Sequence, residues 1–519
     1  MALVVREKLD SKKHVFVDWS LIEPGYAVSW SDLLGTEWET PRGIKLTVVK
    51  PRIEAEPLVQ LEHPWETGYT LHTTILDDDG RHMLYYTCYN QMPGDPTERQ
   101  LNPYTYLLCY AESDDGISWT KPTIGRVDWR GTKENNIVYG TNLSLGRPVP
   151  TATVFKDPSA PPDERYKIIH RGKISPEGPS CVFGATSPDG ISWTAIEKPL
   201  IPDYFSDTQI VVRFDEDLGK YAGYFRGWTG HAEGPSHGPR GRRTIAYAET
   251  EDFNHWSEPE TIVTTDVHDH PGTDIYTNAY ATWPDADAHL MFPAFYQREK
   301  DVMSVQLLTS RDGIKWERHT SQREPLIDGG DPGTSGAPRR DWTAGFYAGA
   351  GVVSLRPDES SIAVISNRRS HNNNRAGTGE GDVLESLQQE HYPSPVGSYS
   401  GQITMATWPK DGFVCLEAEE DGFFATTPFV FEGGTLKLNG WSRYRGGINV
   451  ELADSTNEGR GFAEPVASRS FENCDEITGF DVNRTVTWSG ESDLSQWEGK
   501  LVRLRFKMRR ARLYSIWFE

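Results

Sequence analysis

The sequence predicts an all-β protein in which a five-bladed β-propeller is followed by a C-terminal β-sandwich. Three observations lead to this prediction: a short turn phrase that recurs along the 519-residue chain, a paired-strand pattern between its copies, and a change of pattern near residue 411. We expect residues 1–55 to form an N-terminal extension that packs on the propeller. Residues 56–410 would then form the five blades, and residues 411–519 would form the sandwich.

The recurring phrase reads SDDGISW at residues 113–119, SPDGISW at 187–193 and SRDGIKW at 310–316. A degenerate copy, TEDFNHW, covers 250–256, and a possible fifth, PKDGF, covers 409–413. Asp-Gly favours a tight turn because glycine accepts a positive φ and aspartate hydrogen-bonds to nearby backbone. We therefore interpret the phrase as a structural turn that ends part of each repeating unit, outside any active site.

Paired apolar strands joined by Asp-rich turns lie between these copies. Examples are TTILDDDGRHMLYYT at 73–87 and TQIVVRFDEDLGKYAGYFRG at 208–227, which are typical of β-hairpins. A third strand follows each hairpin, as in LLCYAES at 107–113. Five such units with almost no helical periodicity favour radial repetition, because a propeller leaves only short, protected strand edges.

The last part of the chain shows a different pattern. Residues 371–401 are a polar, Gly-rich insertion in the last blade, and long loops of this kind are usually functional or disordered. From about residue 411 the strands become evenly spaced. In KLVRLRFKMRRARLYSIWFE, residues 500–519, apolar and basic residues alternate, as expected for one buried and one wet face. This pattern suits a β-sandwich that either binds carbohydrate or braces the propeller.

Composition limits the classes of partner and cofactor that we expect. The net charge of −22 argues against nucleic acid and anionic membranes, which would repel the surface. The five cysteines lack the spacing of a zinc site or a disulfide framework, so no cofactor is expected, and a structural calcium ion is left open. The N-terminus has no signal-peptide core and no run approaches a membrane span, which predicts a cytoplasmic protein unless a signal was trimmed. The oligomeric state is left open.

Four segments carry a resemblance to a known family. They are YAESDDGISWTKP (110–122), VFKDPSAPPDERYK (154–167), SDTQIVVRFDEDLGKY (206–221) and DGFVCLEAEEDG (411–422). The chain resembles the five-bladed propeller glycoside hydrolases of the invertase/levanase and arabinanase/xylosidase type, and is most similar to an uncharacterised bacterial group with a C-terminal β-sandwich. Sialidases fit less well, because their aspartate boxes place one residue between Asp and Gly. The resemblance implies a carbohydrate substrate and acidic residues in the central pocket, at the openings of the first strands.

Carboxylates at these strand openings are the catalytic candidates. The resemblance implies a nucleophile or base on blade one, a stabilising acid on blade two and a general acid on blade three. Asp207 in FSDTQIVV opens blade three and is the expected general acid, with Glu66 before blade one or Asp274 before blade four as base or nucleophile. Asp341, before blade five, would tune the charge. Two carboxylates are needed because one protonates the leaving oxygen while the other attacks or activates water.

Other residues near the same rim are candidates for substrate binding. They are His72, Arg147, Gln209, Arg226, Trp228, Arg243, Tyr276, Asn278, Trp342, Tyr347 and His371. Arginines there are suited to an anionic sugar such as a uronate or a sulfated unit, and solvated surface is the alternative. Lys156-Asp157-Pro158 resembles an Arg-Asp-Pro motif, but it follows its strand, so we expect a turn there.

Three functions are compatible with these patterns. The first is a glycoside hydrolase that cleaves a chain end or an oligosaccharide by carboxylate chemistry. The second is a noncatalytic carbohydrate-binding protein, which the lack of the usual acids on blades one and two favours. The third is a lyase or transferase acting on uronic or fructosyl sugars through His72 and tyrosines. The sequence leaves the sugar, its linkage and the stereochemistry open.

Overall fold

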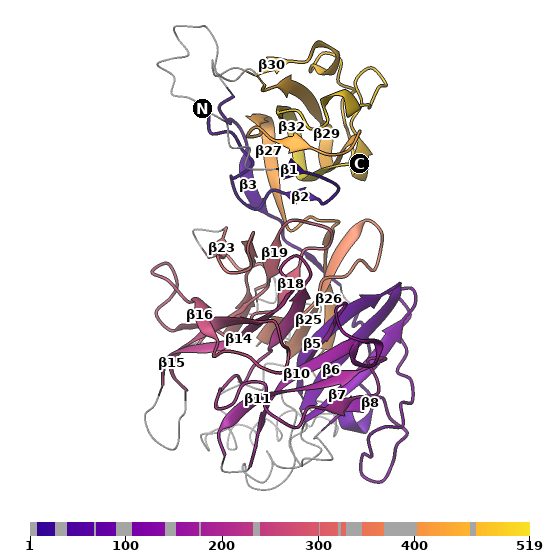
Figure 1. Cartoon of the computed structure of the whole chain (residues 1–519), viewed down its shortest axis with the longest axis vertical. Helices are drawn as coiled ribbons and strands as arrows, with labels where there is room; N and C mark the ends of the chain where they lie inside the picture. Colours follow the sequence, from indigo (N-terminus) through magenta and orange to yellow (C-terminus); the bar gives the residue numbers. More distant parts are fainter. Residues whose placement is uncertain are drawn as a thin grey trace, which may run out of the picture.

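The computed structural model describes residues 8–25, 39–54, 56–66, 69–89, 106–140, 152–175, 178–231, 239–299, 302–319, 323–328, 345–367, 402–456 and 463–519. Across these ranges the chain is all-β, with strands and short 3-10 turns but no α-helix. Figure 1 shows a larger group of sheets and, above it, a smaller C-terminal group. In the part of the chain described, no helix has the length and apolar character that a membrane crossing requires.

Four antiparallel sheets of four strands each follow one another along the described chain. Sheet 1 contains β5 (Tyr69–Asp78), β6 (Arg81–Tyr89), β7 (Tyr106–Ser113) and β8 (Ile137–Tyr139). Sheet 2 contains β9 (Thr153–Lys156), β10 (Tyr166–Lys173), β11 (Ser180–Ser187) and β12 (Thr194–Ala195). Sheet 3 contains β13 (Val211–Asp215), β14 (Lys220–His231), β15 (Pro239–Thr250) and β16 (Glu260–Val263). Sheet 4 contains β18 (Tyr280–Thr282), β19 (His289–Met291), β22 (Leu308–Ser310) and β23 (Glu317–Arg318).

Sheet 5 has seven strands and draws on distant parts of the chain. In order they are β17 (Thr273–Ile275), β20 (Ala294–Gln297), β21 (Val302–Val305), β24 (Gly345–Ala348), β25 (Glu359–Asn367), β26 (Gln402–Pro409) and β4 (Arg52–Ile53). The first three strands alternate along the chain with strands of sheet 4. β17 precedes β18 by a few residues, and β20 and β21 lie between β19 and β22. The last strand, β4, comes from the N-terminal segment and pairs with β26.

The first strands of neighbouring sheets contact one another. β5 contacts β9, and β9 in turn contacts β13. β5 also contacts β25 of sheet 5, and a parallel bridge joins Thr74 to Ala350. Sheet 1 therefore contacts both sheet 2 and sheet 5.

The turn phrase builds the same turn at each of its three full copies. In SPDGISW, Ser187 Oγ accepts a hydrogen bond from Gly190 N at 2.9 Å, and Asp189 Oδ1 accepts from Ile191 N and Ser192 N at 2.8 and 2.6 Å. Gly190 has a φ of 75°. The copies at 113–119 and 310–316 repeat these bonds. The interpretation of the phrase as a structural turn is confirmed.

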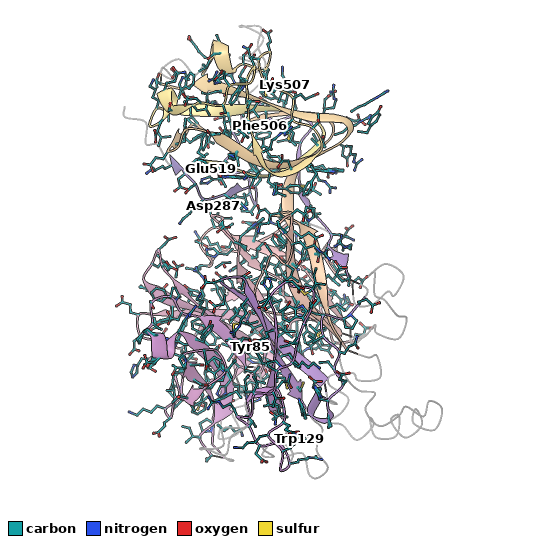
Figure 2. All side chains as sticks on the ribbon, turned by 90° about the vertical axis from the view of Figure 1, so that its right-hand side faces the viewer. Tyr85, Trp129, Asp287, Phe506, Lys507 and Glu519 are labelled. Atoms are coloured by element: carbon teal, nitrogen blue, oxygen red, sulfur yellow. The ribbon has the colours of Figure 1, made fainter. Side chains whose placement is uncertain are left out.

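The turns also connect neighbouring sheets. The hydroxyl of Tyr85, on β6 of sheet 1, donates to Gly190 O in the turn between β11 and β12 of sheet 2 at 3.0 Å. Tyr224, on β14 of sheet 3, makes the equivalent bond to Gly313 O beyond β22 at 3.0 Å. Figure 2 places Tyr85 inside the larger group of sheets. These two turns are therefore points of contact with the preceding sheet.

The two degenerate copies differ from the full ones. At 250–256, Thr250 Oγ1 accepts from Asp252 N at 3.1 Å, which keeps part of the pattern. At 409–413, Asp411 itself has the positive φ, 57°, and its fully buried carboxylate pairs with Lys13 Nζ at 2.7 Å. The fifth copy therefore anchors the N-terminal segment and does not repeat the turn.

The C-terminal group consists mainly of one seven-stranded sheet. Its strands are β3 (Lys45–Val48), β27 (Val414–Ala425), β32 (Val502–Phe518), β29 (Leu436–Asp454) and β30 (Glu464–Pro465), with β2 (His14–Val15) on β32 and β31 (Phe480–Thr485) on β29. β1 (Lys8–Leu9) and β28 (Val430–Phe431) form a separate two-stranded sheet. In the described ranges the short 3-10 turns are η1 (Pro64–Glu66), η2 (Pro162–Glu164), η5 (Ala467–Arg469) and η6 (Ser495–Trp497).

The basic face of β32, which the sequence predicts to be exposed to solvent, is partly buried. Arg503 and Arg505 of β32 are only 7% and 8% exposed. Glu39 pairs with both arginines, and Glu451 pairs with Arg505 at 2.9 Å. These carboxylates neutralise the arginines and so permit their burial, contrary to the exposed face that the sequence predicts.

The N-terminal segment joins the two groups. We expected residues 1–55 to pack on the repeating sheets, and His14 Nδ1 does lie 3.2 Å from Asp287 Oδ2 at the junction seen in Figure 2. The same segment also supplies β1, β2 and β3 to the C-terminal sheets. An apolar cluster that includes Val15, Trp408 and Tyr514 fills the junction. The insertion at 371–401 lies outside the described residues.

Candidate functional site

A partly exposed carboxylate lies where the ends of sheets 2, 3 and 5 approach one another. Asp207 precedes β13, and its side chain is 29% exposed. Arg226, a buried residue of β14, donates from Nη1 to Asp207 Oδ1 at 2.5 Å and from Nη2 to the carbonyl oxygen of Tyr276. The backbone nitrogen of Arg226 also donates to Ser206 Oγ at 3.1 Å. One arginine thus holds the Asp207 loop against the residue that follows β17.

The charges around Asp207 determine its protonation. Burial raises the pKa of Asp207, but the charges of Arg226, Arg171 and Arg243, together with the hydrogen bond from Arg226, outweigh burial and lower the pKa below its ordinary value. Asp207 is therefore ionised at neutral pH. A general acid must carry a proton when substrate binds. This placement argues against the expected general-acid role and suits a base, a nucleophile or a charge stabiliser.

Aromatic side chains surround the arginines. The guanidinium carbon of Arg226 lies 4.6 Å from the ring centre of Tyr276 and 5.9 Å from that of Trp228. For Arg243 the corresponding distances are 5.3 and 5.1 Å. Phe205 lies 6.4 Å from Trp228, measured between ring centres. Phe205, Trp228 and Tyr276 are partly exposed, so they offer apolar ring surface beside the carboxylate.

Several buried polar atoms at this place have no hydrogen-bond partner. Within the described residues they are His72 Nδ1, Thr73 Oγ1, Gln209 Oε1, Arg226 Nε, Trp228 Nε1 and Arg243 Nε. Buried polar atoms are nearly always hydrogen-bonded to protein, water or ligand. These unpaired donors and acceptors are therefore available to water or to a polar ligand near Asp207.

His72, on β5, belongs to the buried floor of this site. Its ring centre lies 6.0 Å from that of Tyr347 on β24. Burial and the nearby charge of Arg226 lower the pKa of His72 to about 3, against the opposing effect of Asp207. The imidazole is therefore neutral at physiological pH and is too weak a base to accept a proton readily. This argues against a lyase or transferase mechanism that uses His72 as its base.

Asp274 and Asn278 are close to the same cluster but are occupied by structural contacts. The carboxylate of Asp274 is 1% exposed and pairs with Arg243 Nη1 at 2.7 Å and Arg298 Nε at 2.7 Å. The amide of Asn278 donates to the carbonyl oxygens of Gln209 and Tyr224 at 3.0 and 3.1 Å. These contacts argue against the base role expected for Asp274 and the substrate-binding role expected for Asn278.

Glu66 lies at a separate, fully buried position in η1, before the first strand of sheet 1. Its carboxylate accepts from Tyr86 Oη at 2.5 Å and from Lys121 Nζ at 2.8 Å. It also accepts from the backbone nitrogens of residues 62 and 63. None of these described partners belongs to the Asp207 cluster. Complete burial and full hydrogen bonding argue against the base role expected for Glu66.

Asp157 is a structural turn residue, as its position after a strand predicted. β9 ends at Lys156, and the carboxylate of Asp157 is 1% exposed. It pairs with Lys167 Nζ at 2.7 Å and accepts from Tyr221 Oη at 2.7 Å. These bonds connect the turn to β10 and to sheet 3.

Sequence reasoning missed Arg171, Phe205 and Arg298. Arg171 and Arg226 occupy equivalent positions on β10 and β14, each two residues beyond the partner of the first residue of β9 or β13. The repeated tripeptides HRG at 170–172 and FRG at 225–227 were the available signal. Four further candidates, namely Arg147, Asp341, Trp342 and His371, lie outside the described residues. Among the residues described, no group of three or more His, Cys, Asp or Glu side chains is arranged to hold a metal ion.

Comparison with known proteins gives only distant likenesses. No family model and no curated protein matches the chain. Among solved structures, one titled "Glycoside hydrolase" is 12% identical, with a TM-score of 0.43, and the match covers 70% of this chain and 92% of that one. A GH32 β-fructofuranosidase from Bombyx mori is 9% identical, with a TM-score of 0.41 and coverage of 90% and 95%. A family 43 arabinoxylan arabinofuranohydrolase from Bacillus subtilis, in complex with cellotetraose, is 13% identical, with a TM-score of 0.35 and coverage of 91% and 99%. These likenesses are too distant to assign an activity, which has to be inferred from the site.

Proposed function

We propose that the protein is a glycoside hydrolase and that its sugar binds at the Asp207 site. One observation carries this proposal: an ionised, partly exposed carboxylate is held by a buried arginine among aromatic faces and unpaired polar atoms. Sugar rings need apolar surface for their C–H faces and hydrogen-bonding groups for their hydroxyls. The Asp207 site offers both.

We also propose that sheets 1 to 5 are the five blades of a propeller, with the Asp207 site in its central pocket. The contacts of β5 with both β9 and β25, and the closure of sheet 5 by β4, support this arrangement. For the C-terminal group we propose a sandwich formed by bending of the long strands. Register shifts in β27 and β29, around a shared apolar cluster, support such bending.

Hydrolysis of a glycoside breaks the bond between the anomeric carbon and the leaving oxygen. The leaving oxygen gains a proton, and the anomeric carbon gains a hydroxyl group from water. Asp207 would attack the anomeric carbon or take the proton from water, since it is ionised. The carboxylates of Glu66 and Asp274 are occupied by buried contacts, so Asp341 is the sequence-predicted candidate for the proton donor that the release assay tests.

The experiment is sugar release from a panel of oligosaccharides by wild type, Asp207→Asn and Asp341→Asn. We expect Asp207→Asn to lower kcat/KM by about a thousandfold, the scale of a lost acid, base or nucleophile. Asp217→Asn is the matched control, because Asp217 is 81% exposed and pairs only with Lys12 among the described residues. Melting temperatures distinguish lost chemistry from lost folding. Full turnover by Asp207→Asn would overturn the proposal.

A noncatalytic carbohydrate-binding function is the second candidate. It is favoured by one observation: in the described part of the cluster, Asp207 is the only carboxylate that is partly exposed. Glycan binding by wild type without any release of sugar would support this candidate over the hydrolase.

A further inference from the structure

We infer that the sugar bound at the Asp207 site carries a negative charge, as a carboxylate or a sulfate does. This inference rests on the proposed glycan site and adds the substrate class. It follows from the charge balance of the described residues of the site and from one arginine that forms no ion pair with a described carboxylate.

The described charges of the site do not cancel. Two carboxylates, Asp207 and Asp274, are surrounded by four arginines, namely Arg171, Arg226, Arg243 and Arg298. Among the described residues two positive charges are therefore in excess, in a chain whose net charge is −22. The described part of the site thus has a charge opposite to that of the protein as a whole.

Arg171 accounts for one of the excess charges. Its Nε donates to Ser180 Oγ at 2.7 Å, and its guanidinium carbon lies 4.6 Å from the ring centre of Phe205. Within the described chain no carboxylate lies at ion-pair distance from Arg171. It is partly exposed, and it occupies on sheet 2 the position that Arg226 occupies on sheet 3. Arg226 forms an ion pair with Asp207, whereas the equivalent Arg171 forms none with a described carboxylate.

A neutral sugar gives no reason for this arrangement. Holding partly buried positive charges close together costs free energy unless a negative charge approaches them. A sugar carboxylate or sulfate supplies that charge and accepts two parallel hydrogen bonds from a guanidinium group. The negative surface elsewhere repels anions only weakly at distances beyond the Debye length of about 8 Å at physiological salt. Recognition of the anion therefore depends on these few residues.

The test uses oligosaccharides in matched pairs that differ in charge. Oligogalacturonides and alginate oligosaccharides are paired with their methyl esters, and carrageenan oligosaccharides with their desulfated forms. Binding is measured by calorimetry, and sugar release is followed in parallel. We expect at least one acidic member to bind about tenfold more tightly than its neutral partner, the scale of a hydrogen bond to a charged group. Whether the methyl-ester or the desulfated pair shows the difference identifies the anion as a carboxylate or a sulfate.

Two arginine variants test whether Arg171 provides this preference. Arg171→Gln should remove most of the difference within the preferred pair. Arg126→Gln is the matched control, because Arg126 is exposed and also donates to a serine hydroxyl, Ser192 Oγ, at 2.8 Å. The control should keep the preference. Melting temperatures of both variants show whether the fold is intact.

The outcomes separate this inference from the proposed function. Cleavage or binding of neutral members as strong as that of their acidic partners would overturn the inference and leave the glycosidase proposal standing. A preference that survives Arg171→Gln unchanged would overturn the assignment to Arg171. Absence of binding to every acidic member would also overturn the inference, whereas the glycosidase proposal is decided by the separate release assay with Asp207→Asn.

Discussion

Single buried residues at the site make the stability of the protein depend on pH, and His72 is the clearest case. Its pKa is about 3 in the folded protein, below the ordinary value of 6.5, because of burial and the charge of Arg226. Between these two values the unfolded chain binds the proton and the folded chain does not. Stability is therefore complete above about pH 6.5 and falls as the pH decreases toward 3, by about 1.4 kcal/mol per pH unit for this residue.

Urea unfolding at about pH 7, 6 and 5 measures this dependence. His72→Gln should reduce the slope of the unfolding free energy with pH by about 1.4 kcal/mol per unit below pH 6. Burial also lowers the pKa values of His289 and His319 to about 4. The unfolding free energy of the variant should therefore still depend on pH, with a smaller slope. The exposed His268→Gln serves as the control. An unchanged slope in His72→Gln would contradict the buried, neutral state of this residue.

At the scale of elements, the recurring turn acts as a connector between sheets, and two glycines test this. Gly190 and Gly80 both have a positive φ, of 75° and 87°, so an alanine strains either turn by about 1 kcal/mol. An added Cβ at Gly190 would overlap the buried hydroxyl of Tyr85, whereas Gly80 has no atom within 4 Å of such a Cβ. Gly190→Ala should therefore lose about 1–3 kcal/mol more than Gly80→Ala, because Tyr85 also loses its partner.

Unfolding free energies of the two variants in urea give the difference directly. A further double substitution, Gly190→Ala with Tyr85→Phe, should recover part of the loss, because the hydroxyl that clashes is gone. Equal losses in Gly190→Ala and Gly80→Ala would mean that the turn serves its own hairpin only and does not hold the neighbouring sheet.

For the whole molecule, local patterns were predictable and long-range pairings were not. Asp-Gly spacing predicted the turns because their hydrogen bonds join residues only two or three positions apart. Asp207 could be selected as a strand-opening residue, but its protonation depends on Arg171 and Arg243, which lie 36 positions away on either side. The pairing of β3 with β27 joins residues more than 350 positions apart, and no local period records it. For the same reason the sequence predicted Glu66 as a catalytic base, although Lys121 and Tyr86 donate hydrogen bonds to its carboxylate.

The shared construction of the C-terminal group leads to the last prediction, that residues 411–519 do not fold alone. The sheet lacks β2 and β3 in such a fragment, and its apolar cluster lacks Leu9, Phe16, Leu21 and Ile22. Arg503 also loses Glu39. We expect no cooperative urea transition for the fragment, followed by near-ultraviolet circular dichroism.

A peptide of residues 8–54 added in trans should restore a cooperative transition, with a midpoint that rises with peptide concentration, because binding to the folded form alone stabilises it. The same peptide with Phe16→Ala should stabilise the fragment less. The ring centre of Phe16 lies 6.0 Å from that of Phe424, and loss of a buried phenylalanine costs about 3–5 kcal/mol. A cooperative transition of the fragment without peptide would instead make residues 411–519 an independent domain, as the sequence pattern alone suggested. The two results differ in what the N-terminal segment does: in the first it is part of the C-terminal core, and in the second it is only a connection between the two groups of sheets.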